Sequence, residues 1–103
     1  MPALNNIGFE SLPITNTAGG LQSIPTAAQS FVGVLETADI RVRIDGNAPT
    51  TSTGRLIRAE ETVLLKSRGE LTQASFIRDG STSATVQGHY YDKPIQAGFV
   101  MQV

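Results

Sequence analysis

The segment from Asp39 to Asp45 alternates strictly between apolar and charged side chains. The apolar members are Ile40, Val42 and Ile44, and the charged members between and after them are Arg41, Arg43 and Asp45. A period of two is typical of a β-strand with one face in a core and the other in water. Asp45-Gly46 then supplies the positive φ angle and the side-chain hydrogen bond that a turn requires. We therefore predict that residues 41–57 form a strand, a turn and a second strand.

Other parts of the chain also have strand character. They are Ser30–Glu36, Thr62–Lys66, Leu71–Arg78 and Ala84–Tyr91. The last two flank the turn-forming residues Arg78 to Ser83, which predicts a hairpin. A helix is expected for at most one short turn, near Arg58–Glu61. Repeated turn signals between short strands predict an all-β fold, either an antiparallel β-sandwich or a jelly-roll-like barrel.

Charged residues are concentrated in the middle of the chain. Residues 1–35 contain a single charged side chain, Glu10, and residues 94–103 contain none. This distribution suggests three regions: an extended N-terminal arm over residues 1–26, a β-sandwich domain over 27–93, and an apolar C-terminal tail or closing strand over 94–103.

The composition excludes several functions. The chain has no cysteine, so thiolate metal sites and cysteine nucleophiles are impossible. Eight Lys and Arg residues against nine Asp and Glu residues give a net charge of -1, which argues against nucleic-acid binding. No apolar run is long enough for a membrane helix, and the N-terminus does not resemble a signal peptide.

Residues suited to catalysis are few. His89 is the single histidine and has no evident partner, which indicates a surface or packing role. Glu60 and Glu61 are adjacent, so on a strand they would point to opposite faces and could not flank one bond. We expect no enzyme activity, no metal and no cofactor.

Two groups of residues are candidates for contacts with other subunits. The apolar members are Ile95, Phe99, Val100, Met101 and Val103, and the basic members are Arg41 and Arg43. An apolar chain end must be buried, either as a last core strand or against a neighbour. The arginines either form a solvated sheet face with acidic neighbours or a charged contact face.

The region from residue 38 to residue 91 resembles small virion proteins of tailed bacteriophages. The matching positions are Arg41, Arg43, Asp45, Gly46, Ala48, Pro49, Thr50, Gly54, Phe76, Ile77, Arg78, Ala84, Tyr90 and Tyr91. Val86 stands where the pattern has a leucine-like residue. The resemblance implies a β-sandwich that coats or joins a phage particle, and it does not extend to either end of the chain.

The leading hypothesis is a capsid decoration (cement) protein, made in the host cytoplasm and located in the virion. Its partners would be the major capsid protein or other virion subunits, and it would act as a homo-oligomer, for example a trimer, or as a monomer ordered on the lattice. A neck, connector or tail component is the alternative within this class. A carbohydrate-binding β-sandwich is the alternative from another class, although Tyr90 and Tyr91 point to opposite faces and tryptophan is absent.

Overall fold

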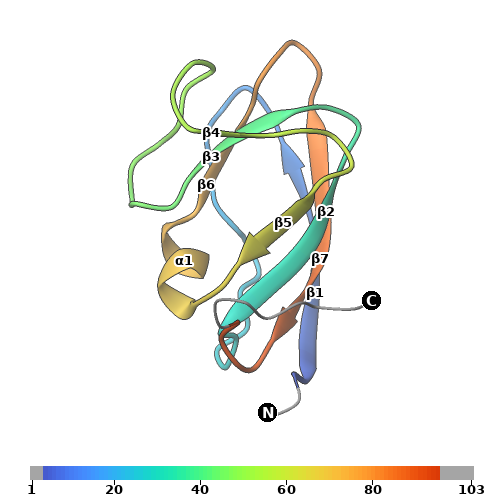
Figure 1. The fold of residues 1–103 in the computed structure, drawn as a ribbon, viewed down its shortest axis with the longest axis vertical. Coiled ribbons are helices and arrows are strands. Elements are labelled where there is room, and N and C mark those ends of the chain that lie inside the picture. Colours follow the sequence, from blue (N-terminus) through green and yellow to red (C-terminus); the bar gives the residue numbers. More distant parts are fainter. Residues whose placement is uncertain (1–3, 96–103) are drawn as a thin grey trace.

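The chain folds into two antiparallel β-sheets that pack face to face (Figure 1). The computed structural model describes residues 4–95. One sheet has the strand order β1-β7-β2-β5 and the other has the order β4-β3-β6. The strands are β1 (Asn6–Ile14), β2 (Ser30–Glu36), β3 (Ile40–Arg43), β4 (Arg55–Ile57), β5 (Thr62–Leu65), β6 (Ser75–Arg78) and β7 (Ala84–Tyr91). The predicted all-β class is confirmed, but the two sheets are separate over residues 4–95 and do not close into a barrel.

The N-terminal residues differ from the expected arm. Residues 6–14 form the edge strand β1, which pairs with β7 along its whole length. Glu10, Leu12 and Ile14 face the core and are buried. Because half of this strand faces inward, the segment belongs to the folded domain, and the boundary drawn at residue 26 needs correction.

The strand–turn–strand prediction for residues 41–57 agrees with the structure. β3 pairs with β4 in antiparallel register, with Ile40 opposite Ile57 and Val42 opposite Arg55. The strand ends at Arg43, so Ile44 lies in the loop and is exposed instead of facing the core. Gly46 has a φ of 85°, as its position after Asp45 predicts.

The predicted hairpin between residues 71 and 91 is wrong. β6 pairs with β3 in one sheet, whereas β7 lies between β1 and β2 in the other. The turn at Asp79-Gly80 therefore carries the chain from one sheet to the other. The expected strand also begins late, because residues 68–73 form a helix.

That helix is α1 (Arg68–Gln73). At Arg58–Glu61, where one short turn was expected, the Glu61 amide donates to the Arg58 carbonyl at 3.0 Å, but the positive φ of 74° at Glu60 makes this turn non-helical. Ser67 caps α1 by accepting a hydrogen bond from the Glu70 amide at 3.3 Å. Glu70 in turn accepts one from the Lys66 amide at 2.8 Å, an arrangement close to a capping box. No helix in the described part of the chain is long and apolar enough to cross a membrane.

The core lies between the two sheets. Its largest fully buried side chains are Tyr90, Phe31, Phe76, Leu35, Ile40, Leu71, Val63 and Val86. The Phe31 and Tyr90 rings are in contact, with centroids 5.0 Å apart. Gly33 and Gly88 lie opposite each other on neighbouring strands, where a Cβ on either would come within 3 Å of the Phe31 ring. The two glycines thus make room for Phe31 at the centre of the larger sheet.

Candidate functional site

The outward side of the four-stranded sheet has an unusual side-chain pattern. The pairing registers place Phe9 beside His89, His89 beside Val32, and Val32 beside Leu64. These four residues form a row across all four strands. Phe9 is 51% exposed, and its ring contacts His89 edge-on with centroids 5.1 Å apart. The row is therefore largely apolar and open to solvent.

A second row lies next to the first. It consists of Ser11, Gln87, Val34 and Thr62 in the same strand order. Val34 is 46% exposed, and Ile7 near the start of β1 is also exposed. Two adjacent rows thus present apolar groups separated by neutral polar ones.

Charge is nearly absent from this side of the sheet. Among the outward positions of the four strands, Glu36 at the end of β2 is the single residue with a formal charge. Its carboxylate accepts a hydrogen bond from the Gln87 side chain at 2.8 Å. We call the two rows together the uncharged face: Phe9, His89, Val32, Leu64, Ser11, Gln87, Val34 and Thr62. An exposed sheet surface that combines apolar groups with neutral polar ones and carries almost no charge is a candidate protein interaction site.

Arg41 and Arg43, predicted as contact residues, belong to the other sheet and have partners within the chain. The Arg41 Nε donates to Asp79 at 2.9 Å, and its Nη1 donates to the Gly54 carbonyl at 3.1 Å. Arg43 pairs with Asp45, where the guanidinium holds the pKa of that carboxyl well below its usual range. These contacts match the interpretation of the arginines as a sheet face with acidic neighbours.

The apolar residues predicted at the C-terminus divide into two groups. Ile95 is buried in its own chain, where its amide donates to the Lys66 carbonyl at 2.9 Å. Phe99, Val100, Met101 and Val103 lie outside the described residues. The structure thus brings neither the arginines nor Ile95 to the uncharged face.

Groups suited to chemistry are scattered over the described part of the chain. His89 is exposed beside Phe9, and Glu61 accepts a hydrogen bond from the Arg58 amide in a turn. Residues 4–95 contain no group of three or more His, Cys, Asp and Glu side chains that could hold a metal ion.

One buried polar cluster was not foreseen from the sequence. The Glu10 carboxylate accepts hydrogen bonds from the Tyr90 hydroxyl and from the amides of Gln22 and Ser23, the last two at 2.8 and 3.0 Å. Burial and the contact with Glu10 raise the pKa of Tyr90 above its ordinary value. The cluster links β1, β7 and the loop after β1, so its evident role is structural. The alternation of Glu10, Leu12 and Ile14 is the sequence signal that could have indicated it.

Comparison with known proteins found no matching family model, no matching curated protein and no matching solved structure.

Proposed function

We propose that this protein is a structural subunit of a bacteriophage virion, and that it decorates and stabilises the head shell as a cement protein. The observation that supports this proposal best is the uncharged face. A sheet surface with exposed Phe9, Val34 and Leu64 and almost no charge is suited to burial against another protein. The resemblance of residues 38–91 to small phage virion proteins gives the class of partner.

The uncharged face would lie against the major capsid protein. Binding to the assembled shell and not to its dissociated subunits stabilises the shell by mass action. Such a role requires a surface of matching shape and a stable domain, and it requires no catalytic group. The opposite sheet, with Arg41 and Arg43 tied into its own loops, would face away from the shell.

Co-sedimentation with purified empty phage head shells tests the proposal. The purified protein is mixed with shells that lack it, and the bound amount and the thermal midpoint of shell disruption are measured. We expect saturable binding in a fixed ratio to the capsid subunit, together with a higher disruption temperature. Binding to purified tails or connectors in place of shells would instead assign the protein to the neck or tail, and binding to none of the three would overturn the proposal.

A further inference from the structure

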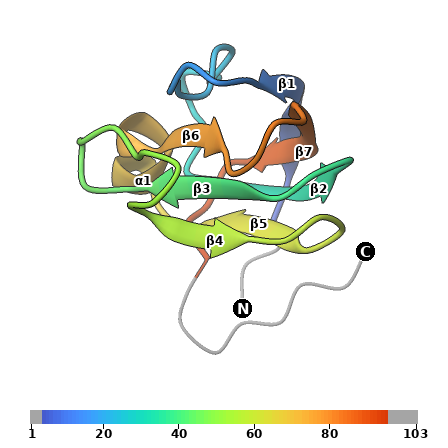
Figure 2. The ribbon, with the colours of Figure 1, turned by 90° about the horizontal axis from the view of Figure 1, so that it is seen from above.

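His89 lies in the interior of the uncharged face. It is an exposed, outward residue of β7, and β7 lies between β1 and β2 in the larger sheet (Figure 2). The pairing registers put Phe9 on one side of His89 and Val32 on the other. A partner surface that covers this row of the face must therefore also cover the imidazole.

The imidazole has apolar neighbours and no anionic partner within residues 4–95. Its ring contacts Phe9 edge-on, with centroids 5.1 Å apart. The two ion pairs of the described residues, Arg41–Asp79 and Arg43–Asp45, both lie away from β7. A positive charge on His89 would thus be exposed to water and paired with no described side chain.

The other charged or titratable groups near this side of the sheet lie at the ends of its strands. They are Tyr91, Asp92 and Lys93 at the end of β7, Glu36 at the end of β2, and Lys66 after β5, whereas Glu10 of β1 faces the core. The Glu36 carboxylate accepts from the Gln87 side chain, and the Asp92 carboxylate accepts from the Asn5 amide and side chain. Each of the two carboxylates is therefore held by a partner other than His89.

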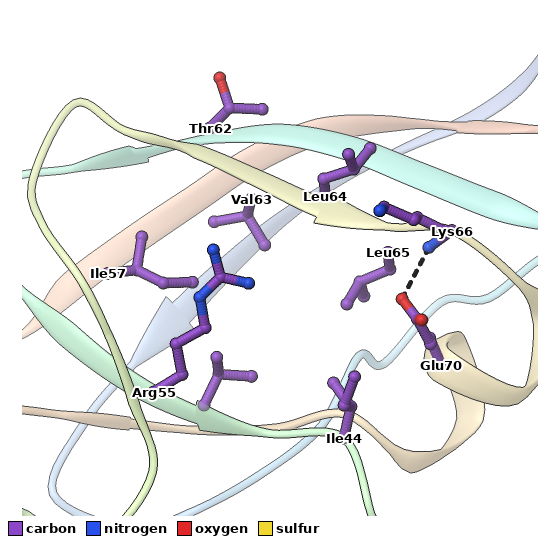
Figure 3. A pocket seen from close by; sticks show the side chains of 10 residues that line it. Ile44, Arg55, Ile57, Thr62, Val63, Leu64, Leu65, Lys66 and Glu70 are labelled. Carbon is purple, nitrogen blue, oxygen red and sulfur yellow. Dashed lines mark hydrogen bonds between the residues drawn. The ribbon is translucent and has the colours of Figure 1, made fainter. Parts of the chain in front are cut away.

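The edge strand β5 separates the uncharged face from a groove of about 390 Å³ that opens between β5 and β4 (Figure 3). Val63 and Leu65 are buried on the groove side of β5, whereas Thr62 and Leu64 are exposed members of the face. The charged residues at this edge line the groove, and they are Arg55, Lys66 and Glu70. Among the eight members of the face, His89 is the single residue that can gain a charge near neutral pH.

Burial of the face would make the charge of His89 decisive for binding. Histidine side chains change charge between about pH 5 and pH 8. Transfer of a group from water into apolar surroundings without a counter-ion disfavours its charged form. An uncharged His89 can be covered together with Phe9 and Val32, but a protonated one would lose its water without gaining a partner.

We propose that the partner surface opposite His89 is apolar and carries no acidic group, so that the face binds with His89 uncharged and loses affinity when His89 takes up a proton. This inference rests on the proposed binding to the head shell and names the chemistry of the shell surface involved. Because binding disfavours the protonated form, affinity should be highest at weakly alkaline pH and should fall by up to about tenfold per pH unit on acidification. An acidic group on the partner would produce the opposite dependence.

The pH dependence of binding to purified empty head shells tests the inference. Co-sedimentation gives the affinity at about pH 8 and at about pH 5.5, on either side of the range in which histidine titrates. We expect the affinity of the unmodified protein to be about tenfold lower at the acid pH. His89→Gln should change by less than about twofold between the two values, and it is the control for titration of the shell itself, which acts equally on both proteins.

Two further variants test whether the position of the histidine matters. Leu64 lies in the row of His89 and Ile44 lies off the face in the β3–β4 loop, with 38% and 44% exposure. Leu64→His added to His89→Gln should restore weaker binding at acid pH, whereas Ile44→His added to His89→Gln should not. Thermal unfolding at both pH values checks that every variant is folded.

The outcomes separate this inference from the proposed function. Saturable shell binding with equal affinity at the two pH values, or an equal pH dependence of the unmodified protein and His89→Gln, would overturn the inference and leave the proposed function standing. Tighter binding at acid pH that is lost in His89→Gln would show an acidic partner surface and would also overturn it. Absence of shell binding at both pH values would overturn the proposed function and this inference together.

Discussion

Glu10 shows how one side chain can determine whether a segment belongs to a domain. It is the single charged residue of positions 1–35, and its carboxylate is buried with three hydrogen-bond donors directed at it. A buried carboxylate whose hydrogen bonds are all made holds its donors in one arrangement. Removing the carboxylate would leave these donors without an acceptor, which lowers the free energy of unfolding. Glu10 therefore fixes the loop at Gln22 and Ser23 against the inner side of β1 and β7.

Replacing Glu10 by leucine should destabilise the protein by about 3 kcal/mol, because the Tyr90 hydroxyl and two amides lose their acceptor. The free energy of unfolding in urea measures this. Glu36→Leu is the matched control, since Glu36 is exposed at the end of β2, and its effect should stay within about 0.5 kcal/mol. Equal urea midpoints of unfolding for Glu10→Leu and Glu36→Leu would show that the hydrogen bonds to Glu10 do not contribute to stability.

Ionisation of Asp45 makes the stability of the folded state depend on pH in the acid range. Its hydrogen bonds from Arg43 and Asn47 hold its pKa below the ordinary value of about 3.9. Because the folded pKa is the lower one, ionised Asp45 favours the folded state above about pH 4, and this contribution is lost as pH falls through the folded pKa. An NMR titration of the carboxyl carbon should give a midpoint clearly below that of an unperturbed aspartate. Arg43→Gln should move the midpoint upward, and an ordinary midpoint in the unmodified protein would contradict the Arg43–Asp45 pair.

At the scale of elements, local alternation predicted strands well and their partners poorly. β3 was foreseen because Ile40 and Val42 alternate with arginines, and the turn after it followed from Asp45-Gly46. β1 was missed because its inner face includes Glu10, and the scarcity of charge suggested an arm. The expected hairpin of β6 and β7 was wrong for another reason. The choice of pairing partner for each strand depends on how the two sheets pack, and the local sequence pattern carries no information about that choice.

The uncharged face was also beyond sequence reasoning. Its members come from four strands that are all well separated in the chain, and they become neighbours only through the pairing registers of these strands. Arg41 and Arg43 stood out in the sequence because they are charged and alternate. Their partners Asp79 and Gly54 could not be inferred until the fold was known.

The turn between β3 and β4 allows a controlled test of backbone strain. Gly46 has a φ of 85°, and a Cβ placed there meets nothing within 4 Å. Gly46→Val should therefore cost about 1–2 kcal/mol through the backbone conformation alone. Gly80→Val is the control, because Gly80 has equally open surroundings and no positive φ. A thermal unfolding midpoint for Gly46→Val equal to that of Gly80→Val would contradict the role assigned to Gly46.

At the scale of the whole molecule, the solvent-facing sides of the two sheets differ in charge. The larger sheet has the uncharged face, and the smaller one has Arg41 and Arg43 paired with acidic groups of its own loops. This difference gives the domain a side suited to burial and a side suited to water. The proposed role on a virion depends on that difference and not on any single residue.

The most direct test of this account is the affinity for empty head shells of two variants that add the same charge to different sides. Val34 on the uncharged face and Ile44 in the β3–β4 loop are matched, with 46% and 44% exposure and β-branched side chains. The account predicts that Val34→Glu weakens shell binding at least about tenfold, about 1.4 kcal/mol, while Ile44→Glu binds within about twofold of the unmodified protein. Equal binding by Val34→Glu and the unmodified protein, with both variants folded, would contradict the claim that this face contacts the shell.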